Sequence, residues 1–393
     1  MSEEKNVPNI RFKGFTDPWE QRKLGSAYEI TMGQSPNSNN YTKNPNDFIL
    51  VQGNADIKNG RVVPRMWTKQ ITKLANPGDI ILSVRAPVGD VGITNYTVVL
   101  GRGVASISGD DFIYQTLIKM KTFGFWRKFS TGSTFESINS KDIKNAVILV
   151  PIANERRNIG TIFKSVDATI ALHQQKVTQL KELKKLLMQK IFDQEWRFRG
   201  FTDPWEQRKL GNVGEVHSGV GFPEIEQGGT EGIAFYKVSD MNIVGNESVM
   251  KKAHNYVNTE QIEKRNWKII KHVPAIIFAK VGAAIMLNRK RIVQSPFLID
   301  NNIMTYIFDK SWDVFFGKTL FDTINLPKYA QTGALPSYNA SDIKNIKVLI
   351  PNKNLQTKIG VLFKKIDTTI ALHQQKVDQL KELKKYLMQN LFV

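Results

Sequence analysis

The sequence predicts an α+β protein made of two similar half-subunits, each a globular domain followed by a long helix. Three observations lead to this prediction: two segments that occur twice in the same order, apolar residues at helical spacing, and short strand-like runs between the repeats. The two long helices are expected to pair as an antiparallel coiled coil, which would relate the halves by a pseudo-two-fold axis.

The duplicated segments are almost unchanged between copies. They are residues 11–25 with 197–211 and residues 169–192 with 369–392. The first pair differs only at Lys13 and Arg199, and the second pair differs at four of 24 positions. The intervening inserts are much less alike until about Asp142 and Asp342. The duplicated segments form a constant frame around two different inserts, residues 26–168 and 212–368. A constant frame suits a scaffold or a shared partner, whereas different inserts suit two different ligands.

The first repeat contains a helix-start signal. Asp17 suits an N-cap, Pro18 the first helical position and Glu20 the capping-box position, which predicts a short helix that Gly25 ends. Trp19 is expected to pack this helix onto its domain. The second copy repeats the pattern with Asp203, Pro204, Trp205, Glu206 and Gly211.

A longer helix is expected from about Ala153 to Lys190, after the breaker Pro151. Apolar residues recur on one face at Ile159, Ile162, Phe163, Val166, Ile170, Val177, Leu180, Leu183, Leu187 and Ile191. The second copy gives Ile359, Leu362, Phe363, Ile366, Ile370, Val377, Leu380, Leu383, Leu387 and Leu391. Each rod would be roughly 55 Å long at about 1.5 Å per residue. The alternative is that each rod packs only on its own domain.

The inserts predict mixed, strand-rich domains. Asp79–Val84 follows a Pro-Gly turn, Ala275–Ala279 follows Pro274, and Val147–Val150 and Val348–Ile350 each end at a proline. The expected boundaries are residues 1–152 for the first domain, 153–196 for the central helix, 197–351 for the second domain and 352–393 for the C-terminal helix.

Composition restricts the class of partner. The 393 residues carry a net charge of +19, which favours a polyanion such as DNA, RNA or an acidic membrane surface. The absence of cysteine excludes disulfides and thiolate zinc sites and fits a reducing, cytoplasmic location. We expect neither a signal peptide nor a membrane span, since no sufficiently long apolar run occurs.

Catalytic motifs are missing from the sequence. It has no GxxxxGK[ST] phosphate loop, no (N/D)PP(Y/F) motif and no GxSxG motif. The five histidines have no metal-ligand spacing. His173 and His373 fall at matching positions of the two long helices, where a polar residue more often sets register. We therefore expect no catalytic residue and no metal site.

Basic and polar loops in both inserts are the candidate DNA contacts. Arginine donates twice to guanine or clamps a phosphate, and glycine allows close backbone approach. In the second insert, the segment Lys280-Val281-Gly282 is taken to occupy the place of Arg85. The candidates are Gln34, Ser35, Arg65, Lys69, Arg85, Arg102, Thr131, Ser133, Ser218, Lys280, Asn288, Arg289, Lys290, Gln331 and Thr332. Any one arginine could instead be a solvated charge. The helix lysines Lys181, Lys184, Lys185, Lys190, Lys381, Lys384 and Lys385 suit a solvated face or a partner interface.

The whole chain resembles the specificity (S) subunits of type I restriction–modification systems. The resemblance is carried by the double layout of variable domain and long helix, and by several strings. They are PGDIILSVRAPVGDVG (77–92), GRGVA (101–105), VPAIIFAKVGAAI (273–285), the SINSKDIKN/YNASDIKN pair (137–145, 338–345) and TIALHQQK…LKELKK.

This resemblance implies a non-catalytic subunit. Each variable region would be a target recognition domain for one half of a split double-stranded DNA site, and the paired helices would set the gap. Two modification subunits would methylate adenine with S-adenosylmethionine, and two ATP-driven restriction subunits could join. ATP and Mg, like S-adenosylmethionine, would belong to those partners and not to this chain. The different inserts imply an asymmetric target. Rods of roughly 55 Å could hold two reading domains about one duplex turn (~34–36 Å) apart.

Two other classes of function stay open at this point. One is a nuclease or methyltransferase that acts by itself, against which the missing motifs argue. The other is a basic coiled-coil scaffold that contacts nucleic acid or a membrane without sequence preference.

Overall fold

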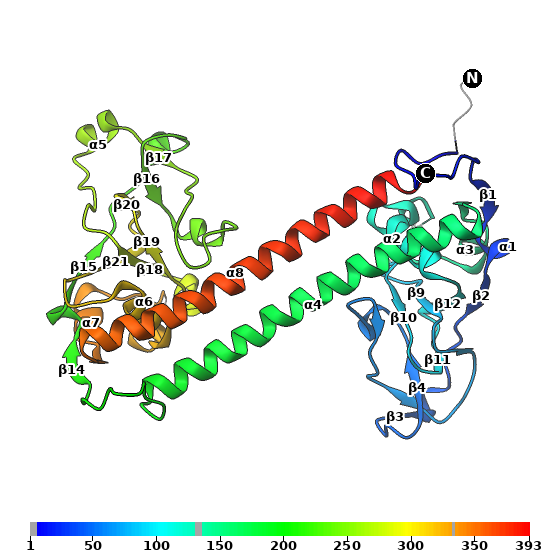
Figure 1. Ribbon diagram of the computed structural model, residues 1–393, viewed down its shortest axis with the longest axis horizontal. Helices are drawn as coiled ribbons and strands as arrows, with labels where there is room; N and C mark the ends of the chain where they lie inside the picture. The colour runs from blue at the N-terminus through cyan, green and yellow to red at the C-terminus, as the bar shows by residue number, and fades with distance from the viewer. Residues whose placement is uncertain (1–5, 130–135, 332–334) are drawn as a thin grey trace. The chain divides into compact units, whose positions relative to one another are not determined.

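The computed structural model describes residues 6–129, 136–331 and 335–393 (Figure 1). The chain divides into two compact units. The first unit holds residues up to Gln174 together with Gln375–Val393, and the second unit holds Gln175–Gln374. Each unit thus contains one mixed domain, the start of the long helix that follows it and the end of the other long helix.

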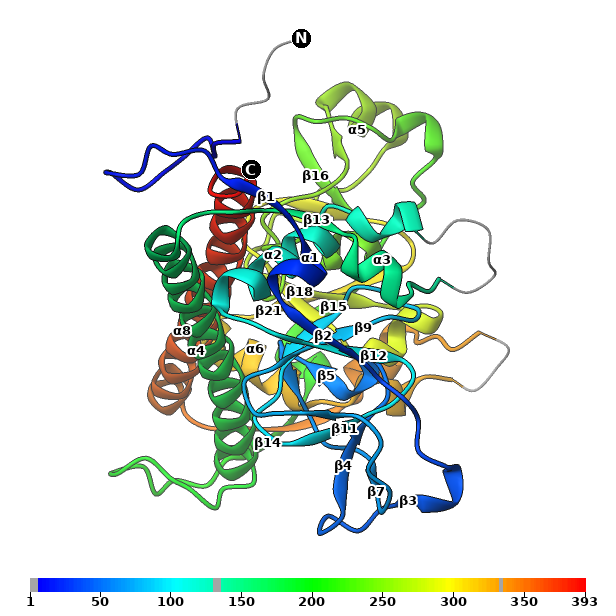
Figure 2. The same cartoon turned by 90° about the vertical axis from the view of Figure 1, so that its right-hand side faces the viewer.

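The first unit contains three sheets (Figure 2). One is the antiparallel pair of β1 (Glu20–Lys23) and β13 (Val147–Val150). The six-stranded sheet has the order β2 (Glu29–Met32), β12 (Val104–Ser108), β9 (Ile80–Ser83), β10 (Val91–Ile93), β6 (Arg61–Val62) and β5 (Ile57–Lys58). The five-stranded sheet has the order β3 (Tyr41–Thr42), β7 (Trp67–Thr68), β4 (Phe48–Val51), β11 (Val98–Leu100) and β8 (Leu74–Ala75).

The second unit repeats this plan, but its two larger sheets contain fewer strands. β14 (Glu206–Lys209) pairs antiparallel with β22 (Lys347–Ile350). The four-stranded sheet has the order β15 (Gly214–Ser218), β21 (Ile303–Phe308), β18 (Ala275–Ala279) and β19 (Lys290–Val293). The three-stranded sheet has the order β17 (Tyr256–Val257), β16 (Ile233–Tyr236) and β20 (Phe297–Ile299). β9 and β18, the strands expected after Pro77 and Pro274, are fully buried.

Short helices cover the sheets. They are α1 (Leu24–Ala27), α2 (Asp111–Thr122) and α3 (Ser140–Lys144) in the first unit, and α5 (Thr259–Arg265), α6 (Val314–Thr323) and α7 (Ala340–Lys344) in the second. Asn139 and Asn339 cap α3 and α7 through capping boxes with Asp142 and Asp342, respectively. The two units therefore have the same local structure from about Asp142 and Asp342, where their sequences become alike again.

The helix predicted in the first repeat is wrong. Residues Glu20–Lys23 form β1, and a four-residue helix begins only at Leu24. Pairing with β13 satisfies the backbone of this segment, so tertiary context overrides the local capping signal. Gly25 does not end a helix; a Cβ there would lie 2.8 Å from Lys144, so the glycine permits close packing of α1 on α3.

The long helices are α4 (Ala153–Phe192) and α8 (Lys353–Asn390), and they pair extensively. In the first unit, Asp167 of α4 pairs with Lys384 of α8 at 2.6 Å. In the second unit, Lys184 of α4 pairs with Asp367 of α8 at 2.7 Å. Early residues of one helix thus face late residues of the other, and the pairing is antiparallel. Most of the predicted apolar stripe is buried or half-buried, but Leu183 and Leu383 are 44% and 45% exposed.

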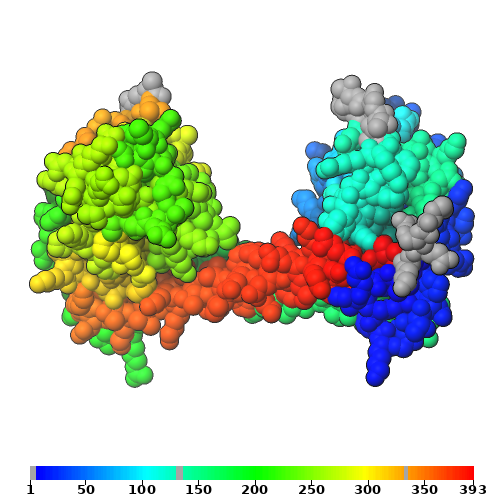
Figure 3. Space-filling view, turned by 90° about the horizontal axis from the view of Figure 1, so that it is seen from above, coloured from blue at the N-terminus to red at the C-terminus, as the bar shows by residue number. Residues whose placement is uncertain are grey.

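An aromatic cluster fixes the end of one long helix to the domain that precedes the other. In the first unit, Phe392 stacks on Phe112 at 5.3 Å and contacts Trp19 and Phe163. Figure 3 shows the red C-terminal segment against the cyan and blue atoms of this unit. The second unit repeats the cluster with Phe192 stacked on Phe316 at 5.7 Å and touching Trp205. The tryptophans therefore pack as expected, although from a strand boundary and not from a helix.

The backbone at the two helix ends also matches. The amide of Trp196 donates to the carbonyl of Lys190 in the loop that follows α4, at 2.9 Å. At the end of α8 the amide of Ile10, from the start of the chain, donates to the carbonyl of Asn390 at the same distance. The N-terminal segment thus takes the place at α8 that the central loop takes at α4.

We predict that Phe392→Ala lowers the free energy of unfolding by about 3–5 kcal/mol, because a buried aromatic ring is lost and a cavity remains. Urea unfolding followed by circular dichroism measures this. Tyr386→Ala, in the last turns of α8, is the control, since Tyr386 is 53% exposed and its loss should cost under about 0.5 kcal/mol. Equal effects of the two substitutions would contradict the role given to the cluster.

Candidate nucleic-acid interface

The first unit contains a polar cleft of about 260 Å³ at the ends of several strands. Three of the predicted DNA contacts, Ser35, Arg85 and Arg102, line it together. The other lining residues are Gln52, Gly53, Asn54, Ser83, Ala86 and Gly103. Arg85, Arg102 and Gln52 are exposed, and Ser35 and Asn54 are half-buried, so the cleft presents donors and acceptors to solvent.

Strand ends and glycines bring these loops together. Arg85 follows β9, Arg102 lies between β11 and β12, and Gln52 follows β4. A Cβ at Gly103 would lie 2.0 Å from the carbonyl oxygen of Gln52, and a Cβ at Gly33 would lie 2.0 Å from that of Gly101. Only glycine allows such close backbone approach, and this explains the GRG pattern noticed in the sequence.

Other candidates lie nearby but do not line the cleft. Arg65 is exposed, and a 3.8 Å ion pair links it to Asp56, whose carboxylate accepts from the amide of Gln52. Gln34 and Lys69 are exposed on neighbouring loops. Surface ion pairs of this length contribute little to stability, so Arg65 stays available for an anion.

The second unit has the same backbone with different side chains. Ser337 bridges to Val281 as Ser137 bridges to Arg85, so within the expected segment Lys280–Gly282 it is Val281 that holds the place of Arg85. Lys280 is the counterpart of Val84 and is half-buried. Gln331 forms a second bridge to Ser337 and is exposed. Ser218 is exposed at the end of β15.

The basic turn Asn288–Lys290 is largely used inside the domain. Lys290 is 2% exposed, and its ammonium donates to Asn288 and to the carbonyl of Ile324, both at 2.7 Å. The Asn288 side chain also bonds the backbone of Ile324 and Leu326. Arg289 is half-buried and donates to Asn242. Lys290 and Asn288 therefore stabilise the fold and are poor candidates for DNA contact.

Three of the sequence candidates, Thr131, Ser133 and Thr332, lie outside the described residues. Gln52 and Asn54 were not among the sequence candidates, although they line the cleft. A signal was present: Gln52-Gly53-Asn54 directly follows the apolar run Phe48–Val51, where a buried strand ends in polar side chains.

The helix lysines divide into three groups. Lys184 and Lys384 form ion pairs with Asp367 and Asp167, so they belong to helix pairing within each unit. Lys190 pairs with Glu195. The rest of the group is exposed: Lys181, Lys185, Lys381 and Lys385.

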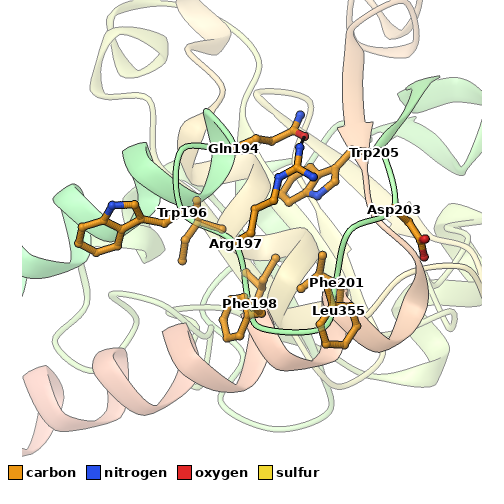
Figure 4. A pocket seen from close by; sticks show the side chains of 10 residues that line it. Gln194, Trp196, Arg197, Phe198, Phe201, Asp203, Trp205 and Leu355 are labelled. Atoms are coloured by element: carbon orange, nitrogen blue, oxygen red, sulfur yellow. Dashed lines mark hydrogen bonds between the residues drawn. The ribbon is translucent and has the colours of Figure 1, made fainter.

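A hollow in the second unit lies beneath the loop that follows α4 (Figure 4). Phe198, Phe201, Trp205 and Leu355 give it an apolar lining, and Arg197 lies beside Trp205. Its volume of about 10 Å³ is room for one water at most, so it is a packing gap and not a ligand site. Among the described residues no cluster of three or more His, Asp or Glu could hold a metal ion.

The helices within residues 6–129, 136–331 and 335–393 include none that is long and apolar enough to cross a membrane.

Two similar units with a conserved frame and polar loops at strand ends define a two-site recognition protein. The family model for the type I restriction modification DNA specificity domain matches twice, over residues 16–182 and 202–382. The chain therefore belongs to this family: it is a DNA specificity subunit of a type I restriction–modification system and is itself non-catalytic.

Relatives and a solved structure agree with this assignment. A putative type I restriction enzyme MjaX specificity subunit of Methanocaldococcus jannaschii is 31% identical over 196 residues, which is 47% of this chain and 45% of that protein. The MjaIX specificity subunit of the same organism is 25% identical over 80% of this chain and 76% of its own length. The crystal structure of a type I S subunit from M. genitalium shares the fold with a TM-score of 0.70 at 15% identity, covering 98% of this chain and 99% of that one.

We predict a pH dependence that arises from Lys290. Burial lowers the pKa of Lys290 from 10.5 to about 8, with a smaller lowering by Lys318 and an opposing effect of Asp322. Between these values the unfolded chain binds the extra proton, so stability should rise with pH from about 8 to about 10.5. Relative to Lys290→Met, the wild-type free energy of unfolding should rise by about 3 kcal/mol across this window.

Denaturant titrations at pH 8, 9 and 10 measure this difference. Lys328→Met, which removes an exposed lysine, is the control and should follow the wild type at each pH. A constant difference between wild type and Lys290→Met would contradict the assignment.

Proposed function

We propose that this subunit reads an asymmetric, bipartite DNA target, with the loops of each unit recognising one half-site. In this proposal residues 1–152 and 197–351 are the two recognition domains, and residues 153–196 and 352–393 are the spacer helices. One observation carries it: Arg85 and Arg102 in the first unit correspond, by backbone hydrogen bonding, to Val281 and Asn301 in the second. Two units with the same backbone arrangement but different side chains at these positions suit recognition of two different half-sites.

The residues proposed to contact DNA are those that the fold leaves accessible. Phosphate contacts would supply affinity, and contacts to base edges would supply the choice of sequence. They are Gln34, Ser35, Arg65, Lys69, Arg85, Arg102, Ser218, Lys280, Arg289 and Gln331.

The partners proposed are two modification subunits, which methylate adenine with S-adenosylmethionine, and two restriction subunits, which use ATP and Mg. Support for two copies of a partner comes from the duplicated frame. The same apolar side chains are exposed on both long helices: Leu172 and Leu372 are 58% and 60% exposed, and Leu183 and Leu383 are 44% and 45% exposed. Identical exposed residues in both copies suit binding of the same partner twice.

Methylation mapping tests the proposal. The chain and its modification subunit are produced together in a host without adenine methylation, and the genome is sequenced with a method that detects methyladenine. We expect a single split motif with a fixed gap, unequal half-sites and one modified adenine on each strand.

Two results would contradict this proposal. Absence of any motif, with the two proteins soluble and associated, would favour a scaffold that binds nucleic acid without sequence preference. Methylation or cleavage by the chain alone would favour a stand-alone enzyme.

A further inference from the structure

The two arginines of the cleft in the first unit have no competing ion pairs among the described residues. Neither Arg85 nor Arg102 makes a salt bridge there, although Arg65 and Asp56 lie close by. Both residues are exposed and neither side chain pairs with an acid within the described ranges, so the donors of each guanidinium remain available to a ligand.

The backbone of both arginines is held rigidly. The amide of Arg102 donates to the hydroxyl of Ser35 at 3.0 Å. The buried hydroxyl of Ser83 bonds the carbonyls of Arg85 and Pro87 at 3.0 and 3.1 Å. These bonds hold the backbone at both positions, and with it the point at which each side chain begins. Such preorganisation suits recognition of a defined ligand edge better than a diffuse charge does.

The other lining groups favour a base edge over a phosphate. The side-chain amide of Gln52 donates to the hydroxyl of Tyr41 at 3.1 Å, which leaves its carbonyl oxygen as an acceptor. Asn54 also carries an acceptor. A phosphate only accepts hydrogen bonds and leaves these acceptors unused, whereas a base pair presents both donors and acceptors in the major groove and can use both kinds of group in the cleft.

The matching place in the second unit lacks this chemistry. The amide of Gly101 donates to Val51 as that of Asp300 donates to Tyr236, so the next residue, Asn301, corresponds to Arg102. Val281 takes the place of Arg85. Neither Val281 nor Asn301 has the two-pronged donor that suits guanine.

We propose that Arg102 and Arg85 read guanine in the half-site recognised by the first unit, with Gln52 accepting from an amino group of a neighbouring base. This inference rests on the proposed function and adds the base and the residues that select it. The second unit uses another contact at the same place, so guanine at this register belongs to one half-site only.

Methylation maps of variants, made in complex with the modification subunit, test the inference. Arg102→Ala and Arg102→Lys should each relax one guanine position in one half-site. Methylation at sites with another base there should rise on the order of 10- to 100-fold relative to the cognate site, as expected for one bidentate pair. Lysine keeps the positive charge but lacks the planar, two-pronged donor of the arginine guanidinium. Relaxation in both variants therefore shows that this paired donor, and not the charge alone, selects guanine.

Asn301→Ala, at the matching exposed position of the second unit, is the control. It should leave that guanine position unchanged and alter only the other half-site. Urea unfolding of each variant verifies that the fold is kept, and Arg102→Lys serves if the alanine variant is unstable.

Two outcomes would overturn the inference. One is an unchanged motif with weaker methylation at every site and a shallower salt dependence of binding, which identifies Arg102 as a phosphate contact. The other is full guanine discrimination in a folded Arg102→Ala variant. Failure of the wild-type chain to produce any motif would instead contradict the proposed function itself.

Discussion

The fold depends on the insertion of one phenylalanine from the end of each long helix into an aromatic cluster of the domain that precedes the other helix. Phe392 meets Trp19, Phe112 and Phe163 in the first unit, and Phe192 meets Trp205 and Phe316 in the second. The phenylalanines that end the long helices and the two tryptophans belong to the duplicated segments, whereas Phe112 and Phe316 lie in the inserts, on α2 and α6. Because both inserts keep an aromatic residue at this anchoring position, the loops at the strand ends are free to differ between units.

In the proposed function, recognition depends on side chains that differ between the units on a backbone that the units share. The strand pairing and loop hydrogen bonds around Arg85 recur around Val281, and those around Gly101 recur around Asp300. Glycines such as Gly33 and Gly103 bring loops from separate strands into contact in the first unit. The chemistry of a half-site can therefore change by substitution of a few exposed residues while the sheet and the helix contacts stay in place.

The sequence was informative where its signal is periodic or duplicated. The long helices, the buried strands β9 and β18 and the pairing of the helices were all predictable from apolar spacing. The strand at Glu20–Lys23 was not, because its partner β13 lies more than 120 residues away in the chain and overrides a good local cap. In the site, Arg85 stood out because it follows a buried strand, and Arg102 because it lies between two glycines. The burial of Lys290 and the position of Gln52 in the lining of the cleft depend on tertiary contacts that no local pattern encodes.

The central claim is that the frame is constant and the inserts alone choose the bases. Its most direct test is a chain in which residues 212–341 are replaced by a second copy of residues 26–141, joined at Gly211 and Asp342. Methyladenine sequencing of cells that carry this chain with the modification subunit should reveal two half-sites with the same bases in inverted orientation. A motif that keeps the unequal half-sites of the wild type, from a chimera that folds and binds its partner, would contradict the claim.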